Sequence, residues 1–120
     1  MFHAAYFFTK NMRFLGHLYI GESIRDSDKI KENLLQNKIQ RPVFVISISE
    51  SSDQLDIMEN KYLLQPFLNK DNMLIVGLAG SHEEAVRLVT SMIEKTVRET
   101  GTAEVKKYLL SVDQKEREGI

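Results

Sequence analysis

The sequence contains no cysteine and no tryptophan, and only two of its 120 residues are proline. Without cysteine the chain has no disulfide scaffold, thiolate zinc site, iron–sulfur cluster or thiol nucleophile, which fits a reducing compartment. The chain also lacks an excess of either charge, because its net charge is −1. The largest positive excess lies in residues 1–41, with seven Lys/Arg against four Asp/Glu. This excess is small for a protein that neutralises phosphates, so the composition argues against a nucleic-acid partner.

Long hydrophobic runs are missing as well. Residues 4–8 form an apolar stretch near the N-terminus, but it is far shorter than the about 20 residues that a membrane-spanning helix needs. No basic region precedes this stretch, and no small-residue cleavage site follows it. We therefore expect a cytoplasmic protein with no membrane segment.

The clearest local pattern is a strand that enters a helix through a short glycine turn. Residues 73–76 are Met-Leu-Ile-Val, and Ser81 and Glu84 beyond the turn have the spacing of a helix-capping box. Apolar residues then recur at helical spacing over residues 82–99, and Gly101 suits the position after the helix. Such a segment is half of a βαβ unit and predicts an α/β domain.

The remaining segments predict further strands and helices. Gly16 lies inside an apolar run and indicates a β-bulge or a close approach by another part of the chain. Residues 43–48 are almost all β-branched or aromatic, which is typical of a strand covered on both faces. Caps and prolines set the other boundaries. The predicted strands cover residues 3–8, 13–21, 43–48 and 73–78. Four helices are predicted. The first is capped by Ser27 and reaches Ile39 before Pro42, the second is capped by Asp53 and ended by Pro66, and the last two cover residues 82–99 and 103–112.

These elements predict one small α/β domain over residues 1–120, in the order ββαβαβαα, with residues 113–120 as a frayed tail. The first two strands are expected to pair antiparallel. Helical crossovers would make the second, third and fourth strands parallel. We therefore expect a four-stranded, mixed and mostly parallel sheet that is flanked by helices.

Parallel strands bring their carboxyl ends to one edge of the sheet, where α/β proteins bind ligands. Free amides of the glycine turn and the start of the following helix would attract a small anion there. The alternative is an ordinary turn whose amides are satisfied by its cap, and Glu83 and Glu84 place negative charge where a phosphate would bind. The glycines also lack the spacing of a dinucleotide site or a P-loop. The candidate ligand-binding residues are Glu22, Ser49, Ser51, Gly77, Gly80, Ser81 and His82.

No catalytic or metal-binding arrangement stands out in the sequence. The three histidines, His3, His17 and His82, lack the i, i+4 spacing of a zinc-binding helix. The serines lack the Gly-x-Ser-x-Gly elbow of a nucleophile. Asp56 and Glu59 have the spacing of a solvated helix face rather than of an acid–base pair. We therefore predict no catalytic residue, no metal and no cofactor.

An apolar surplus indicates an interface. Residues 63–68 hold five apolar side chains in a connection that should be partly exposed, and a predicted edge strand carries two phenylalanines. The alternative is that this connection folds over the sheet edge and buries itself. The surplus favours a homo-oligomer or a protein partner, with candidate interface residues Phe7, Phe8, Leu64, Phe67 and Leu68.

Two functions remain open at this point. The first is a non-enzymatic binding or protein-interaction domain that self-associates. The alternative is a protein that binds a small molecule or a nucleotide phosphate, or a small transferase or hydrolase, and that uses the carboxyl edge of the parallel strands.

Overall fold

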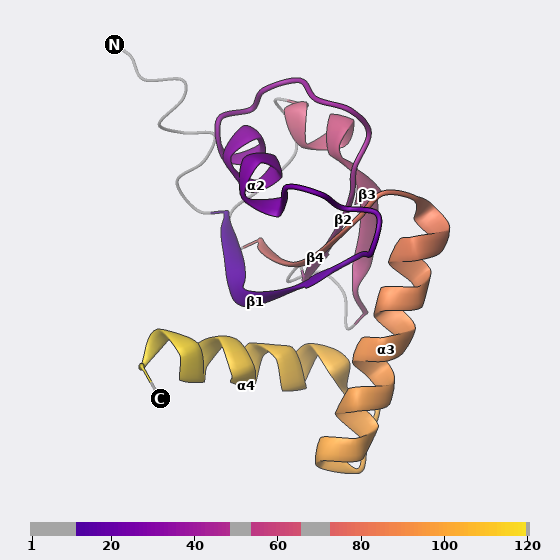
Figure 1. Cartoon of the computed structure of the whole chain (residues 1–120). Coiled ribbons are helices and arrows are strands. Elements are labelled where there is room, and N and C mark those ends of the chain that lie inside the picture. Colours follow the sequence, from indigo (N-terminus) through magenta and orange to yellow (C-terminus); the bar gives the residue numbers. More distant parts are fainter. Residues whose placement is uncertain (1–11, 49–53, 66–72, 120) are drawn as a thin grey trace.

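The structure is a computed structural model that describes residues 12–48, 54–65 and 73–119. Within them, a four-stranded mixed sheet is flanked by helices (Figure 1), which confirms the predicted α/β class. The elements in chain order are β1 (Arg13–Ile20), α2 (Ser27–Leu35), β2 (Phe44–Ile48), β3 (Asp56–Glu59), the 3-10 helix η1 (Asn60–Leu64), β4 (Leu74–Ala79), α3 (His82–Thr100) and α4 (Val105–Arg117).

The strands lie in the order β1-β4-β2-β3. β1 and β4 are parallel, whereas β2 runs antiparallel to both of its neighbours, β4 and β3. Phe44 at the start of β2 therefore pairs with Ala79 at the end of β4, and Ile48 pairs with Leu74. The prediction of a mostly parallel sheet, with β2 and β4 in the same direction, is wrong. The predicted strand over residues 3–8 lies outside the described residues.

The antiparallel direction of β2 relative to β4 results from the segment that connects these two strands. The sequence pattern predicts a helix that begins at Asp53, but residues 54–64 instead contain β3 and η1. Successive side chains of β3 point to opposite faces of the sheet, as in any strand. Ile57 packs in the cluster with α3 and α4, whereas Met58, which pairs with Val45, packs in the cluster on the other face. The inserted strand replaces the single helical crossover that the prediction assumed. As a result β3, rather than β2, runs in the same direction as β4.

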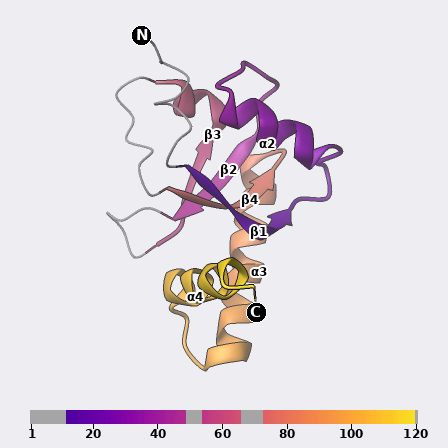
Figure 2. The same ribbon diagram turned by 90° about the vertical axis from the view of Figure 1, so that its left-hand side faces the viewer.

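Two apolar clusters cover the two faces of the sheet. On one face α3 and α4 pack against the strands around buried residues such as Leu15, Met92 and Leu109. On the other face α2 and η1 contribute Leu34 and Leu63. Figures 1 and 2 show the sheet between these layers, with α2 on one side and α3 and α4 on the other. Among the residues that the structure describes, no helix combines the length and the hydrophobicity needed to cross a bilayer.

Helix α2 differs from its prediction at both ends. Its N-cap is Asp26 rather than Ser27, because Asp26 Oδ1 accepts a hydrogen bond from the Lys29 amide at 3.1 Å. A residue in the left-handed region, Asn37 with a φ of 55°, follows the end of the helix. Ile39 therefore lies beyond the helix rather than on its apolar stripe, and its side chain is 88 % exposed.

The segments with strong local signals form as predicted. The apolar runs at residues 43–48 and 73–78 become β2 and β4, whose residues are almost all buried. Helix α3 begins after Ser81, whose Oγ accepts a hydrogen bond from the Glu84 amide at 3.1 Å. It ends at Gly101, which has a left-handed φ of 82°.

Helix α4 is longer than predicted, because residues 113–117 are helical rather than frayed. The reason is Asp113, which is 3 % exposed. Its two carboxylate oxygens accept hydrogen bonds from the Arg13 guanidinium of β1 at 3.1 and 3.2 Å. Arg117 Nε also lies 3.2 Å from Asp113 Oδ2. Two arginines thus compensate this buried charge and hold the last turns of α4 against β1.

Candidate functional site

The carboxyl ends of β1 and β4 lie together, and four predicted ligand-binding residues follow them. Glu22 is exposed in the turn after β1, while Gly80, Ser81 and His82 lead from β4 into α3. The His82 ring stands edge-on to Phe44, at 6.1 Å between ring centroids, because β2 begins where β4 ends. β1 and β4 therefore build part of the edge that the sequence predicts.

The structure does not bring the other three predicted residues to this edge. Gly77 is buried inside β4, where a Cβ would press against the side chains of Ile46 and Met92. Ser49 and Ser51 lie outside the described residues. The strand that precedes them, β2, ends beside the start of β4, at the opposite edge of the sheet. The prediction that three strands end at one shared edge is therefore wrong, because it required β2 to run parallel to β4.

The Glu84 carboxylate occupies the space between the two turns at this edge. It is 9 % exposed and accepts hydrogen bonds from the Gly80 amide at 2.7 Å, the Ser23 hydroxyl at 2.6 Å and the Ser23 amide at 3.1 Å. One half of the predicted capping box is present, because the Glu84 amide donates to Ser81 Oγ. The other half is absent, because the Glu84 carboxylate accepts from Gly80 and Ser23 rather than from the Ser81 amide. These donors, the Gly80 amide above all, stabilise the charged form and lower the pKa of Glu84 from its usual 4.5.

Two glycines make room for this carboxylate. A Cβ on Gly21 would collide with the carboxyl group of Glu84, and a Cβ on Gly80 would collide with Ser23 Oγ. Neither glycine has a positive φ, so close approach rather than backbone conformation requires glycine at both positions. The chain's own carboxylate therefore lies beside the amide where a small anion was expected.

A groove of about 390 Å³ lies elsewhere, between β1, α3 and α4. Figure 1 shows α4 running beneath β1 and meeting the far half of α3, and the groove lies in this corner. Sequence reasoning missed it, because its residues are scattered over the chain. We refer to its buried and partly buried aliphatic side chains as the floor, to its two partly buried tyrosines as the walls and to its charged or polar side chains as the rim. The floor is Leu15, Leu18, Leu109 and Val112, the walls are Tyr19 and Tyr108, and the rim is His17, Lys95 and Glu116.

An irregularity in β1 forms one wall of the groove. The pairing of β1 with β4 shifts register between Phe14 and Tyr19, so the intervening residues arch away from β4. Within this arch the Gly16 amide donates to Glu116 Oε1 of α4 at 2.9 Å, and His17 Nδ1 lies 2.8 Å from Glu116 Oε2. The prediction of a bulge or a close approach at Gly16 is confirmed. The approaching group is a carboxylate, which lies 2.9 Å from where a Cβ would be.

Lys95 reaches the groove from α3. Its Nζ lies 6.0 Å from the centroid of the Tyr19 ring, within the range of a cation–π contact. Among the described residues, no carboxylate lies within the 4.0 Å of an ion pair with Lys95. Glu116, by contrast, is already engaged by Gly16 and His17. The groove therefore combines an apolar floor with a lysine that pairs with no carboxylate in the part of the chain that the structure describes.

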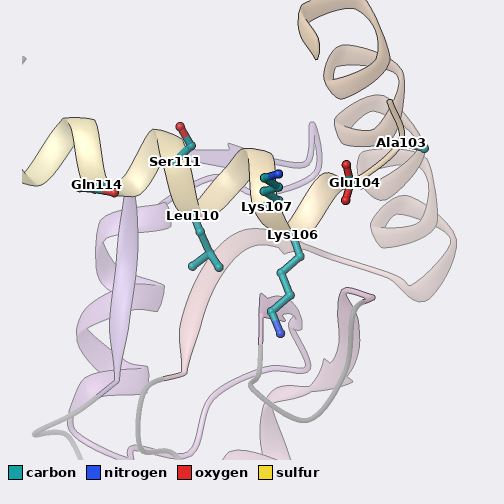
Figure 3. A pocket seen from close by; sticks show the side chains of 7 residues that line it. All are labelled: Ala103, Glu104, Lys106, Lys107, Leu110, Ser111 and Gln114. Carbon is teal, nitrogen blue, oxygen red and sulfur yellow. The ribbon is translucent and has the colours of Figure 1, made fainter. Parts of the chain in front are cut away.

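A second hollow, of about 660 Å³, follows α4. In Figure 3, Leu110 and Lys106 point to one side of the helix and Ser111 points to the other. Its described lining comes from α4 and the two residues before it, Ala103 and Glu104. Within the described residues, one stretch of chain supplies the lining of this hollow and three elements supply that of the groove, so the groove is the stronger candidate site.

The metal and interface predictions can be compared with the described residues only. No group of three or more His, Asp or Glu side chains among residues 12–48, 54–65 and 73–119 is placed to hold a metal ion. Of the predicted interface residues, Leu64 at the end of η1 is 38 % exposed, and the nearby Tyr62 is 46 % exposed. The other predicted interface residues lie outside the described part of the chain, namely Phe7, Phe8, Phe67 and Leu68.

Comparison of the chain with models of protein families, with curated proteins and with solved structures finds no match.

Proposed function

We propose that the protein is a small α/β binding domain without catalytic activity, and that its ligand binds in the groove between β1, α3 and α4. The observation that carries this proposal is the convergence of charged and aromatic side chains from three separate elements over an apolar floor. Ligand pockets are typically concave, mostly apolar and equipped with a few polar groups that orient the ligand. The volume of about 390 Å³ is suited to a small molecule.

The chemistry of the groove favours binding over catalysis. His17 and Glu116 have the composition of a general base with its orienting carboxylate, but Glu116 also accepts from the Gly16 amide. The hydroxyl groups that line the groove are the phenols of Tyr19 and Tyr108, and no serine or threonine is part of its described lining. Within residues 12–48, 54–65 and 73–119, the groove therefore offers the histidine no aliphatic hydroxyl to activate.

The test is a screen of small organic anions, cations and neutral aromatic compounds by NMR spectroscopy. A ligand is expected to shift the amide resonances of Leu18, Tyr19, Lys95 and Tyr108, and to leave those of the Glu84 turn unchanged. It should also raise the unfolding midpoint, because a ligand that binds only the folded state stabilises it. Shifts confined to other parts of the molecule, or no response to a broad panel, would contradict the proposal.

A matched pair of variants assigns the binding to the groove. Val112→Phe places a larger side chain in the groove and should weaken binding at least about tenfold, by direct obstruction. Val86→Phe makes the same change on the outer face of α3, where Val86 is 43 % exposed, and should leave binding unchanged. Circular dichroism and thermal unfolding establish that both variants fold. If Val112→Phe does not fold, the resonance map of the unsubstituted protein still decides where the ligand binds.

Self-association is a second candidate function, which the exposed apolar side chains of Tyr62 and Leu64 favour. Light scattering after size exclusion is expected to give the mass of a dimer at micromolar concentration. Leu64→Asp should shift this mass to that of a monomer, because it places a charge in the proposed contact. Val97→Asp, at a side chain of α3 that is 46 % exposed, is the control and should remain dimeric, because α3 covers the opposite face of the sheet from η1. A monomeric unsubstituted protein would reject this candidate.

A further inference from the structure

We infer that the ligand of the groove is a small amphipathic carboxylate, whose apolar body lies on the groove floor and whose anionic group binds Lys95. This inference depends on the proposed function and deepens it, because it names the chemical class of the ligand. Two independent features of the groove support it, namely the balance of charge along the rim and the shape of the apolar surface beneath.

The charges on the rim select an anion. Glu116 is the only carboxylate in the described lining, and both of its oxygens are engaged, by the Gly16 amide at 2.9 Å and by His17 Nδ1 at 2.8 Å. A cationic ligand would have to displace one of these contacts. Lys95 is exposed and has no ion-pair partner among the described residues. An incoming carboxylate can therefore pair with Lys95 without breaking an existing ion pair, and charge-assisted hydrogen bonds are the stronger kind.

The floor and walls select an apolar body next to that anionic group. Leu18, Tyr108 and Val112 are partly buried and pack on the apolar cluster beneath, so each presents apolar surface to the groove. Lys95 Nζ lies over the Tyr19 ring, 6.0 Å from the centroid of that ring. An aromatic ring on the ligand could contact both tyrosines, since aromatic pairs favour offset or edge-on packing. Burying a ring there also removes apolar surface from water, which a free inorganic anion cannot do.

The geometry further favours a free small molecule over a long chain. The groove is bounded on three sides by β1, α3 and α4, and its volume is about 390 Å³. Pockets of this size accept compact ligands, because volumes of roughly 300 to 1,000 Å³ are typical of small-molecule sites. A short linker between ring and carboxylate would let the ring rest on the floor while the anion reaches the rim.

Three probes with one body and different end groups test the inference. They are 3-phenylpropionate, 3-phenylpropan-1-ol and 3-phenylpropylamine, each titrated into the full chain and followed by NMR spectroscopy and calorimetry. The propionate is expected to bind about tenfold more tightly than the alcohol and the amine, with shifts at the groove resonances, because only it pairs with Lys95. Its affinity should also fall as salt is added, since the rim is exposed and its charges are screened.

Substitutions at Lys95 show whether that cation is the determinant. Lys95→Gln should weaken binding of the propionate about tenfold and leave binding of the alcohol unchanged, whereas Lys95→Arg should retain the preference for the anion. Lys107→Gln is the matched control, because it removes one lysine charge from α4 outside the groove lining and should have no effect. Lys95 and Lys107 are both exposed, so all three variants are expected to fold.

The outcomes separate this inference from the proposed function. If the alcohol or the amine binds in the groove as tightly as the propionate, or if Lys95→Gln binds the propionate normally, the carboxylate inference is overturned while the groove remains a binding site. If none of the three probes binds, the inference is also overturned, and the broad panel decides whether the groove binds anything. If the propionate binds away from the groove resonances, both proposals fail.

Discussion

Leu109→Ala is expected to lower the free energy of unfolding by about 3 kcal/mol, the typical cost of deleting a buried leucine side chain. Leu109 is 1 % exposed and lies in the cluster that joins the sheet to α3 and α4, together with Leu15 and Met92. The loss combines the transfer free energy of the deleted methyl groups with the cost of the cavity that remains. Urea unfolding followed by circular dichroism measures it.

The neighbouring residue provides a matched control. Leu110 is on the same helix turn but is 40 % exposed, so Leu110→Ala removes the same atoms from a partly solvated site. It should cost less than about 1 kcal/mol, because it opens no closed cavity. Similar losses at the two positions would mean that α4 does not pack against the sheet as described here. This result would also mean that Leu109 does not form the floor of the groove, which would contradict the proposed function.

Glu84→Ala is expected to lower the free energy of unfolding by about 2 kcal/mol. The substitution leaves the Gly80 amide and both donors of Ser23 without their acceptor, at a site where the carboxylate is only 9 % exposed. Glu83→Ala is the control, because Glu83 belongs to the same first turn of α3 and is exposed. Both variants lose one negative charge near the start of the helix, so the difference between them isolates the hydrogen bonds of Glu84. Equal effects would show that these bonds add nothing to stability.

The Glu84→Ala variant also gives a prediction for the pH dependence of stability. Because the folded-state pKa of Glu84 is lowered from 4.5, its carboxylate stabilises the folded state fully at pH values above 4.5. This contribution is lost as the pH falls through the folded-state pKa, since the protonated group accepts less strongly. The stability difference between the unsubstituted protein and Glu84→Ala should therefore shrink in acid. A difference that stays constant from pH 7 to about pH 3 would contradict the lowered pKa.

Local sequence patterns predicted those parts of the fold that local physics determines. β2 and β4 are rich in apolar residues, and α3 carries its own cap at Ser81 and its own terminator at Gly101. β3 has only four residues, and its conformation is set by pairing with β2 rather than by its own pattern. A periodicity of apolar residues that looked helical was therefore overridden by a neighbouring strand, and the direction of β2 was predicted wrongly as a consequence.

The sites show the same division between local and distant interactions. Ser81 and Glu84 are three positions apart, so the sequence could indicate their hydrogen bond, but the Ser23 partner of Glu84 is 61 positions away. Beside the groove, Gly16 gave a signal, because a glycine inside an apolar run indicates close approach. Nothing in the local sequence relates it to Glu116 or to Lys95. Such pairings depend on how whole elements pack, and one sequence without its relatives does not contain that information.

The contact between Gly16 and Glu116 joins residues that are 100 positions apart, and so does the contact between Arg13 and Asp113. During synthesis on the ribosome, β1 therefore emerges long before the helix that supplies its carboxylate partners. Until translation has passed residue 116, the arch in β1 has no acceptor and the groove lacks one wall. Contacts of this sequence separation also slow folding, because closing so long a loop costs entropy. A molecule that captures a ligand in the groove is thus one that has already completed its fold.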